Sequence, residues 1–129
     1  MKKLFAALGS AALIAASVGV MPTQAASIKP TATATDAGRC LANAVFFSAM
    51  IETINDPEMN KSKPQIDAMG ESWMTYIKGK GGSFSDAAMA EMDATANRYG
   101  EQLKASDNME GLVNTVITDL SNCMNFIQA

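Results

Sequence analysis

The chain has 129 residues, with 10 basic and 13 acidic side chains, two cysteines and no histidine. That length suits one domain but not two. The formal net charge of −3 argues against the basic face that nucleic-acid binding requires. The absence of histidine removes the commonest general base and the commonest metal ligand, so most enzyme classes lack their usual catalytic groups here.

The first residues have the pattern of an export signal. Lys2 and Lys3 supply a positive start, residues 4–20 form an apolar run, and a small-residue cleavage site ends at Ala25. Glycine and serine interrupt the apolar run, so residues 1–25 are predicted to be a cleaved signal peptide rather than a retained membrane helix. Cleavage leaves 8 basic against 13 acidic side chains, a net charge of −5. The mature protein is predicted to be periplasmic or secreted, without membrane insertion.

The mature chain is predicted to begin with a flexible segment over residues 26–35, because this stretch lacks periodicity and contains a proline. A single helical domain is then predicted over residues 36–129. Its first helix would span residues 37–54, with Thr35 or Asp36 as the N-terminal cap. Apolar side chains recur along its inner face every three or four residues, at Cys40, Leu41, Ala44, Phe47, Met50, Ile51 and Ile54, with Val45 and Phe46 widening the face.

The same periodicity predicts two further helices, over residues 64–78 and 83–103. A glycine-rich run separates them, and Ser83 or Ser85 would cap the later helix. Gly70 is expected to allow close approach of a neighbouring helix. The predicted inner faces contain Ile66, Met69, Gly70, Trp73 and Ile77 on the earlier helix and Ala88, Met92, Thr95, Ala96, Tyr99 and Leu103 on the later one.

The strongest apolar rhythm lies in the last predicted helix, over residues 107–127. Asp107 and Glu110 have the spacing of a capping box at its first turn. The apolar side chains recur at three- and four-residue steps, at Met109, Leu112, Val113, Val116, Ile117, Leu120, Cys123, Met124 and Ile127. A stripe this wide requires apolar partners, so this helix is predicted to pack against the others.

The two cysteines relate the first predicted helix to the last. Cys40 falls about one turn after the start of the first helix, and Cys123 about one turn before the end of the last. Four helices with short connections, and no β alternation of useful length, predict an all-α, four-helix up-down-up-down bundle. In that topology these two helix ends are neighbours, and two cysteines in an exported chain are more often bonded than free. A disulfide between Cys40 and Cys123 is therefore predicted.

Carboxylate pairs are the remaining candidates for catalysis. Asp67 and Glu71 are four residues apart on a predicted outer helix face, whereas Glu91 and Asp93 are two apart and point to different sides. Catalytic carboxylates with tuned pKa values are usually buried, so a solvated surface is the favoured interpretation. The sequence predicts no catalytic residue and no cofactor, and an enzyme that acts through carboxylates alone remains an alternative.

Eight methionines follow residue 25, a high density for a chain of this length. Met89 and Met92, three residues apart, are compatible with a thioether site for Cu(I), and exposed methionines would provide an adaptable surface for apolar ligands. Most of the eight fall on predicted inner faces, which favours core filling. A copper-binding protein and a small apolar-ligand binder therefore remain alternatives.

Short sequences at the two ends of the domain resemble those of other small proteins. The sequence Asp-Ala-Gly-Arg-Cys-Leu at residues 36–41 and Asn-Cys-Met at residues 122–124 resemble a group of small exported all-helical bacterial proteins with one cysteine at each end. The function of that group is not defined. Exported acid-stress chaperones of similar size also pair two cysteines within a helical fold, which by analogy alone adds a chaperone-like protein to the alternatives.

These observations favour a binding or interaction protein without catalytic activity. Acidic helix surfaces and adaptable methionines would together suit a basic or mixed protein partner. The residues of this predicted interaction surface are Asp67, Glu71, Met74, Glu91 and Asp93, with Met59 as a further methionine where an inner face ends.

Overall fold

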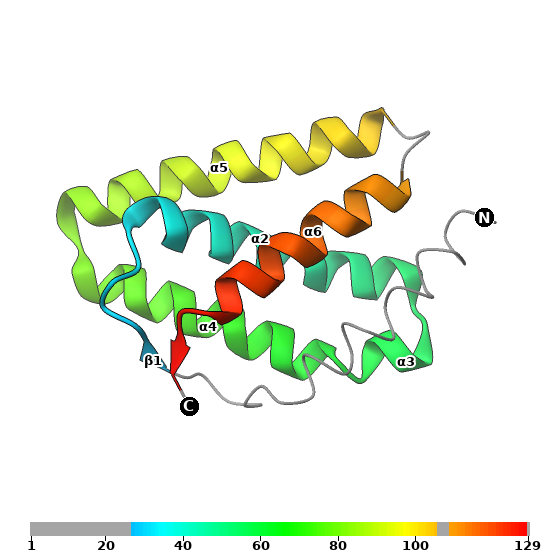
Figure 1. Ribbon diagram of the computed structural model, residues 1–129, viewed down its shortest axis with the longest axis horizontal. Helices are drawn as coiled ribbons and strands as arrows, with labels where there is room; N and C mark the ends of the chain where they lie inside the picture. Colours follow the sequence, from blue (N-terminus) through cyan, green and yellow to red (C-terminus); the bar gives the residue numbers. More distant parts are fainter. Residues whose placement is uncertain (1–26, 106–108, 129) are drawn as a thin grey trace.

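The computed structural model describes residues 27–105 and 109–128, apart from the side chains of residues 109 and 110. In this part of the chain the fold is all-α, with one pair of two-residue strands (Figure 1). No described helix is long and apolar enough to cross a membrane. The predicted signal peptide and the predicted cap at Asp107 lie outside the described residues. The elements are β1 (Ser27–Ile28), α2 (Ala34–Ile54), α3 (Pro57–Asn60), α4 (Lys63–Lys80), α5 (Gly82–Lys104), α6 (Met109–Met124) and β2 (Ile127–Gln128).

Helix α2 begins earlier than the sequence predicts. Its N-terminal cap is Thr33, whose hydroxyl accepts a hydrogen bond from the Asp36 backbone N–H at 3.1 Å. The Asp36 carboxylate in turn accepts from the Thr33 backbone N–H at 3.0 Å, which completes a capping box. The predicted caps, Thr35 and Asp36, are therefore wrong. Several neighbouring side chains here are able to cap a helix, and the reciprocal pair of bonds favours Thr33.

The connection after α2 contains a short helix that the sequence does not predict. Helix α2 ends as expected at Ile54, and Asn55 adopts a left-handed conformation with φ of 52°. The Asp56 carboxylate then accepts hydrogen bonds from the backbone N–H groups of Glu58 and Met59 and so caps α3. Met59 is buried, so this connection contributes to the core.

The segment before α2 packs against the helices, where the sequence predicts a flexible stretch. Strand β1 pairs antiparallel with β2, and the Lys29 N–H donates to the Phe126 carbonyl oxygen at 2.8 Å. Ile28 and Ala32 are buried, and the Tyr76 hydroxyl donates to the Ala32 carbonyl oxygen at 2.8 Å. These partners are distant in the sequence, so local periodicity cannot reveal them.

Helix α6 is shorter than its predicted span of residues 107–127. It ends at Met124, and the last apolar position of the predicted helix, Ile127, belongs to β2 instead. Helical spacing continues through Ile127 in the sequence because Ile127 is also apolar. In the structure Ile127 pairs with Ile28 of β1, and this long-range pairing replaces a further helical turn.

Helices α4 and α5 meet at a single glycine. Gly81 has φ of 61° and ends α4, with its N–H donating to the Ile77 carbonyl oxygen, and α5 begins at Gly82, which has φ of 54°. The glycine-rich break is therefore shorter than predicted. The predicted caps, Ser83 and Ser85, lie within α5 and are also wrong.

Helix α2 lies at the centre of the structure and packs against α5, α4 and α6 (Figure 1). It approaches α5 closely at Gly38, where an added Cβ would lie 2.0 Å from the Ala88 carbonyl oxygen. At Gly70, where the sequence predicts close approach, an added Cβ would lie an ordinary 3.6 Å from the Cβ of Ala44. The requirement for glycine is therefore at the contact between α2 and α5 rather than at Gly70.

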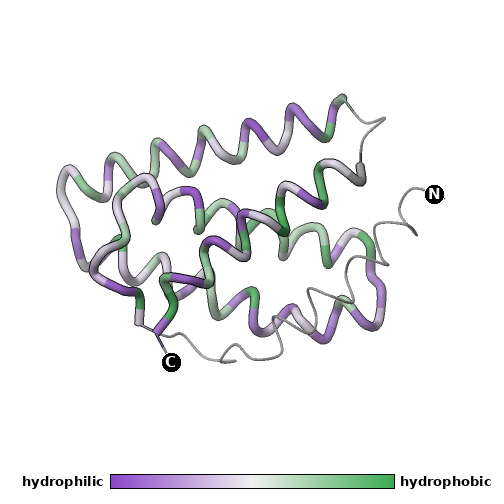
Figure 2. Tube along the Cα trace, viewed as in Figure 1, coloured by the Kyte–Doolittle hydropathy of each residue, from purple (hydrophilic) through white to green (hydrophobic). Residues whose placement is uncertain are grey.

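The residues predicted to face the core are buried more completely on α4 than on α5. Ile66, Met69, Trp73 and Ile77 of α4 are all buried. Of the six predicted inner positions on α5, Ala88, Thr95 and Tyr99 are buried, Met92 is half-buried, and Ala96 and Leu103 are exposed. Helix α5 also carries more hydrophilic residues than α2 (Figure 2). Helix α5 therefore buries fewer residues than its apolar spacing predicts.

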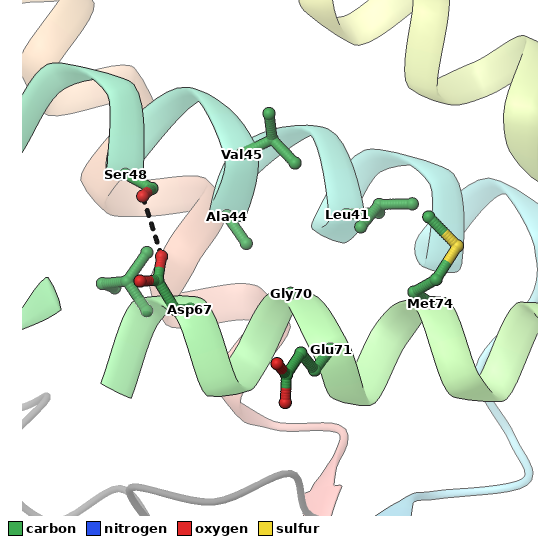
Figure 3. A pocket seen from close by; sticks show the side chains of 9 residues that line it. Leu41, Ala44, Val45, Ser48, Asp67, Gly70, Glu71 and Met74 are labelled. Carbon is green, nitrogen blue, oxygen red and sulfur yellow. Dashed lines mark hydrogen bonds between the residues drawn. The ribbon is translucent and has the colours of Figure 1, made fainter. Parts of the chain in front are cut away.

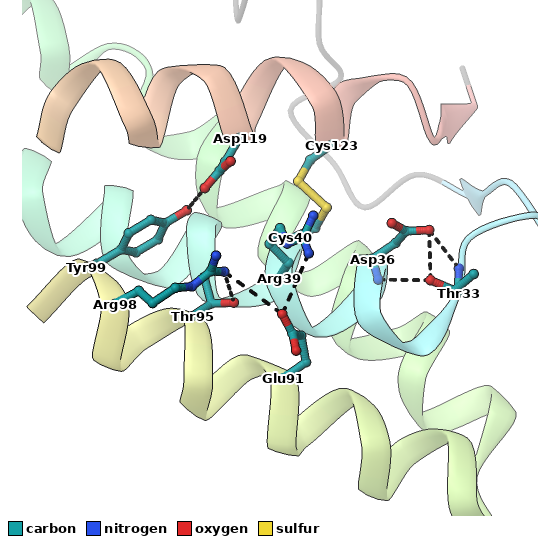
Figure 4. A network of polar contacts seen from close by, with 10 residues as sticks. All are labelled: Thr33, Asp36, Arg39, Cys40, Glu91, Thr95, Arg98, Tyr99, Asp119 and Cys123. Atoms are coloured by element: carbon teal, nitrogen blue, oxygen red, sulfur yellow. Dashed lines mark hydrogen bonds and ion pairs between the residues drawn. A yellow bond between two sulfur atoms is a disulfide. The ribbon is translucent and has the colours of Figure 1, made fainter. Parts of the chain in front are cut away.

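The predicted disulfide is confirmed. Cys40 and Cys123 are bonded, with a Cα–Cα distance of 5.6 Å, and both residues are buried. The bond ties the first turns of α2 to the last turn of α6 (Figure 4). It therefore joins the first and last long helices, as the positions of the two cysteines predict.

Candidate functional site

A groove lies between α2 and α4 on the side of α2 that faces away from α6 (Figure 3). It encloses about 470 Å³. Leu41, Ala44 and Ile66 are buried and form an apolar floor, whereas the Val45 side chain is 51% exposed at the edge. The complete lining is Leu41, Ala44, Val45, Ser48, Ile66, Asp67, Gly70, Glu71 and Met74.

Gly70 helps to create the depth of this groove. An added Cβ at Gly70 would reach only the Cβ of Ala44, so two small residues face one another where larger side chains would fill the space. Leu41 and Met74 lie next to one another further along the same groove (Figure 3). The role of Gly70 is thus to leave a hollow beside α2.

Polar contacts hold one end of the groove in place. The Ser48 hydroxyl donates to the Asp67 carboxylate at 2.8 Å across the groove (Figure 3). Lys63 donates to the other Asp67 oxygen at 2.8 Å and lies 3.3 Å from the Glu52 carboxylate. These bonds join α2 to α4 through exposed side chains, so they define the geometry of the rim more than they stabilise the fold.

These contacts also shift the pKa values of Asp67 and Lys63 at the edge of the groove. Burial alone would raise the pKa of Asp67, but hydrogen bonds from Lys63 and Ser48 and the positive charge of Lys63 outweigh it and lower that pKa. Hydrogen bonds to Asp67 and Glu52 raise the pKa of Lys63. Asp67 therefore remains a carboxylate well into acidic solution, and the groove keeps a negative charge.

The predicted interaction surface is divided between two helices. Asp67, Glu71 and Met74 line the groove together. Asp93 is exposed on α5. Glu91 lies on a different side of α5, where its carboxylate is 3.8 Å from Arg39 and 3.9 Å from Arg98 (Figure 4). Glu91 is therefore engaged with arginines of α2 and α5, as Asp67 is engaged with Ser48 and Lys63.

The sequence analysis did not assign Leu41, Val45 and Ser48 to a site. It placed Leu41 and Val45 on the inner face of their helix, since both are apolar and fit the helical spacing. Ser48 carries a usable signal, because it is a polar residue one turn from the apolar Ala44. Met59, predicted as a surface methionine, is buried in the core.

A second polar feature lies inside the fold. Asn43 is fully buried on α2 and donates to the Val116 carbonyl oxygen at 2.9 Å and to the Tyr99 hydroxyl at 3.2 Å. The Tyr99 hydroxyl donates to the Asp119 carboxylate (Figure 4). This cluster joins α2, α5 and α6. Asn43 interrupts the apolar face between Cys40 and Phe47, which is the signal from which it could have been found.

Within this cluster the Tyr99 hydroxyl is a hydrogen-bond donor. Burial raises the pKa of Tyr99 well above its ordinary value, and the hydrogen bond to Asp119 raises it further. The hydroxyl therefore keeps its proton and acts as a hydrogen-bond donor. A general base or a nucleophile would require the pKa to shift in the opposite direction.

The methionines and the disulfide limit the candidate metal ligands. Both cysteines are consumed by the disulfide. Among the described residues no group of three or more Cys, Asp or Glu side chains is placed to hold a metal ion. Met89 is 38% exposed on α5 and Met92 is half-buried one turn further on, whereas Met59 and Met69 are buried. The proposed Cu(I) site at Met89 and Met92 would therefore lie on the surface of α5.

No protein-family model, no curated protein and no solved structure matches this chain. The described chain is a small all-α protein with one disulfide and an apolar surface groove.

Proposed function

We propose that this chain is a small periplasmic or secreted protein that binds a partner and catalyses no reaction. The groove between α2 and α4 is the observation that carries the proposal. It combines a buried apolar floor, an exposed apolar edge at Val45 and a negatively charged rim at Asp67 and Glu71. An apolar surface bordered by charge is typical of protein-binding sites.

Export is supported by the leader pattern before Ala25 and by the buried disulfide, which suits an oxidising compartment. The proposal treats the four long helices as an up-down-up-down bundle. The single-residue connection at Gly81 between α4 and α5 favours that arrangement. A bundle closed by a disulfide provides a rigid frame, and a rigid frame loses little conformational entropy when a partner binds.

The absence of catalysis is supported by the side chains that the sequence offers. Without histidine, a serine or threonine nucleophile has no usual base, and the disulfide occupies both thiols. The Tyr99–Asp119 pair keeps its proton on the hydroxyl. The carboxylates of the groove are hydrogen-bonded or exposed, whereas catalytic carboxylates are usually buried.

Site-specific photocrosslinking tests the proposal directly. A benzophenone amino acid replaces Val45 at the groove edge in one variant and Thr118, an exposed residue of α6, in a control. We expect a discrete crosslinked partner from position 45 and none from position 118. The purified partner should bind the wild-type protein and bind Val45→Asp about tenfold more weakly, because that variant places a charge on the apolar edge.

The outcome that would overturn the proposal is equally concrete. If neither position captured a partner, and purified protein hydrolysed a panel substrate in a way that Asp67→Asn or Glu71→Gln abolished, the protein would be a carboxylate enzyme. Circular dichroism of each variant serves as the control for folding.

A small apolar ligand is the second candidate occupant, because the size of the groove falls within the range of small-molecule sites. Native mass spectrometry of protein purified from the expressing cells would detect a bound ligand. A ligand mass present in wild-type protein and lost in Val45→Asp would favour this candidate over a protein partner.

A further inference from the structure

Helix α5 lies at the edge of the structure and exposes two large apolar side chains (Figure 1). Among the described residues, the exposed large hydrophobic side chains are those of Val45, Met89 and Leu103. Met89 is 38% and Leu103 is 44% exposed, and the exposed Ala96 stands seven residues from each of them. Seven-residue spacing is that of a seam along which two helices pair. We name this surface the α5 seam, and its residues are Met89, Ala96 and Leu103.

The α5 seam lies beside the face through which α5 packs on α2. At about 100° per residue, Ala96 lies about 80° around the helix from the buried Ala88. Glu91, which pairs with Arg39 of α2, lies about 60° from Ala88 in the opposite direction. The seam is therefore on the side of the α2–α5 contact away from that ion pair, where no described element covers it.

Three charged side chains of α5 border the seam. Asp86, Asp93 and Lys104 are exposed and lie about 60–80° around the helix from Ala96, on the side away from α2. The first half of the seam is thus bordered by negative charge and the second half by positive charge. The remaining charged residues of α5 lie about 140–160° from Ala96, outside the seam, and are Glu91, Arg98 and Glu101.

This order of charges determines how a second copy of the chain can pair with the seam. In an antiparallel pair of α5 helices centred on Ala96, Met89 of each copy lies beside Leu103 of the other, because both stand seven residues from the centre. Asp86 stands ten residues before the centre and Lys104 eight residues after it, so these two also become neighbours across the pair. A parallel pair would instead place like charges side by side.

The remaining carboxylate of the border is compatible with this pairing. Asp93 of each copy comes opposite Gly100 of the other, which has no side chain and no neighbour within 4 Å of an added Cβ. The two Asp93 residues are about 9 Å apart along the helix axis. At that separation exposed charges are largely screened at physiological ionic strength.

We propose that the α5 seam is the interface of a weak homodimer, in which the α5 helices of two copies pair antiparallel about Ala96. The dimer buries the apolar seam and forms two Asp86–Lys104 ion pairs related by a two-fold axis. This inference goes beyond the proposed function, because the groove between α2 and α4 contains no residue of α5. The seam extends only about 21 Å along the helix, so we expect association at high protein concentration.

Sedimentation equilibrium of the exported, oxidised protein measures this association. We expect the mean mass to rise from that of one chain towards that of two between about 10 µM and about 1 mM protein. Leu103→Asp should weaken the dimer at least about tenfold, because it places a charge on the apolar seam. Ala94→Asp adds the same charge about 160° around α5 from Ala96 and should change the dissociation constant less than about twofold. Circular dichroism of each variant is the control for folding.

Exchanging the charges tests the ion pairs. Asp86→Lys and Lys104→Asp should each weaken the dimer about fivefold, because each variant replaces two attractive pairs with two repulsive ones. The two changes together restore opposite charges and should return the dissociation constant to within about twofold of wild type. If net charge alone controlled association of this acidic chain, Asp86→Lys would strengthen the dimer and Lys104→Asp would weaken it.

Single cysteines test the direction of pairing. Ala96→Cys places the two new thiols at the centre of the dimer, so mild oxidation should link two copies. Met89→Cys should link them far less, since the two thiols of an antiparallel pair lie about 21 Å apart along the helix axis. The native cysteines do not compete, because both are held in the buried disulfide.

Several results would overturn the homodimer. One is a protein that remains monomeric at about 1 mM. Equal effects of Leu103→Asp and Ala94→Asp, a double charge variant as weak as the single ones, or equally efficient linkage through Met89→Cys and Ala96→Cys would each do the same. These measurements leave the binding function of the groove to be decided by crosslinking from position 45.

Discussion

Gly38→Ala tests the central packing contact of the fold. The added Cβ would lie 2.0 Å from the Ala88 carbonyl oxygen and 2.9 Å from the Cβ of Glu91. The carbonyl belongs to the backbone of α5 and cannot rotate away, so the two helices must separate. Overpacking of this kind costs about 3 kcal/mol at the upper end of its usual range, and alanine regains about 1 kcal/mol of helix propensity. We expect a net loss of about 2 kcal/mol.

Urea and thermal unfolding of the oxidised protein, followed by circular dichroism, measure this loss. For a domain of this size, 2 kcal/mol corresponds to a decrease in Tm of about 10 °C. Gly100→Ala is the matched control, because no atom lies within 4 Å of its added Cβ within α5. That variant should be up to about 1 kcal/mol more stable than wild type, from helix propensity alone.

A second variant sharpens the test. Adding Ala88→Gly to Gly38→Ala should not restore stability, because the clash is with the Ala88 carbonyl oxygen and not with its side chain. If Gly38→Ala were as stable as wild type, or if Ala88→Gly rescued it, the close contact between α2 and α5 would be incorrect.

Three further predictions concern the disulfide, the buried cluster and pH. Cys123→Ser should lower the free energy of unfolding by up to about 4.5 kcal/mol, because the bonded cysteines are 83 residues apart, and an unchanged urea midpoint would contradict this. Tyr99→Phe removes the donor to the part-buried Asp119 carboxylate and one of the two acceptors of the Asn43 amide, so it should cost about 1–3 kcal/mol in urea unfolding, and a loss below 0.5 kcal/mol would refute a stabilising cluster. Without histidine, stability should be nearly constant between about pH 5 and 8. Because the folded-state pKa of Asp67 lies below its ordinary value of 3.8, its pairing with Lys63 stabilises the fold above that value and is lost as pH falls through the folded pKa. Hydrophobic-dye binding should therefore increase only in strongly acidic solution, and an increase near pH 6 would favour a regulated, chaperone-like opening instead.

The site could be predicted only in part. The acidic positions Asp67 and Glu71 and the neighbouring Met74 are recognisable from their spacing, and the structure places them in one groove. Val45 could not be assigned in the same way. Its apolar character and helical position are those of a core residue, but no helix in the described part of the chain covers it, so it forms an exposed edge.

The sequence by itself determined the four long helices and the disulfide. Apolar residues at helical spacing predict the four long helices, because this spacing is a local property of the chain. With two cysteines there is only one disulfide to form within the chain, and their positions near two helix ends predict which helices it joins. The helices follow from residues that are close in the sequence. The disulfide follows because two cysteines allow only one pairing within the chain.

The tertiary structure alone decided which apolar faces are covered. Gly38 rather than Gly70 is the position where only glycine fits, because the Ala88 carbonyl oxygen comes from a helix about 50 residues away in the chain. Strands β1 and β2 pair across almost the whole described chain. Leu103 matches the spacing of a core residue but remains exposed because no element packs above it within the described residues. Periodicity shows which side chains are suited to burial, and only the three-dimensional arrangement of distant segments supplies the neighbours that bury them.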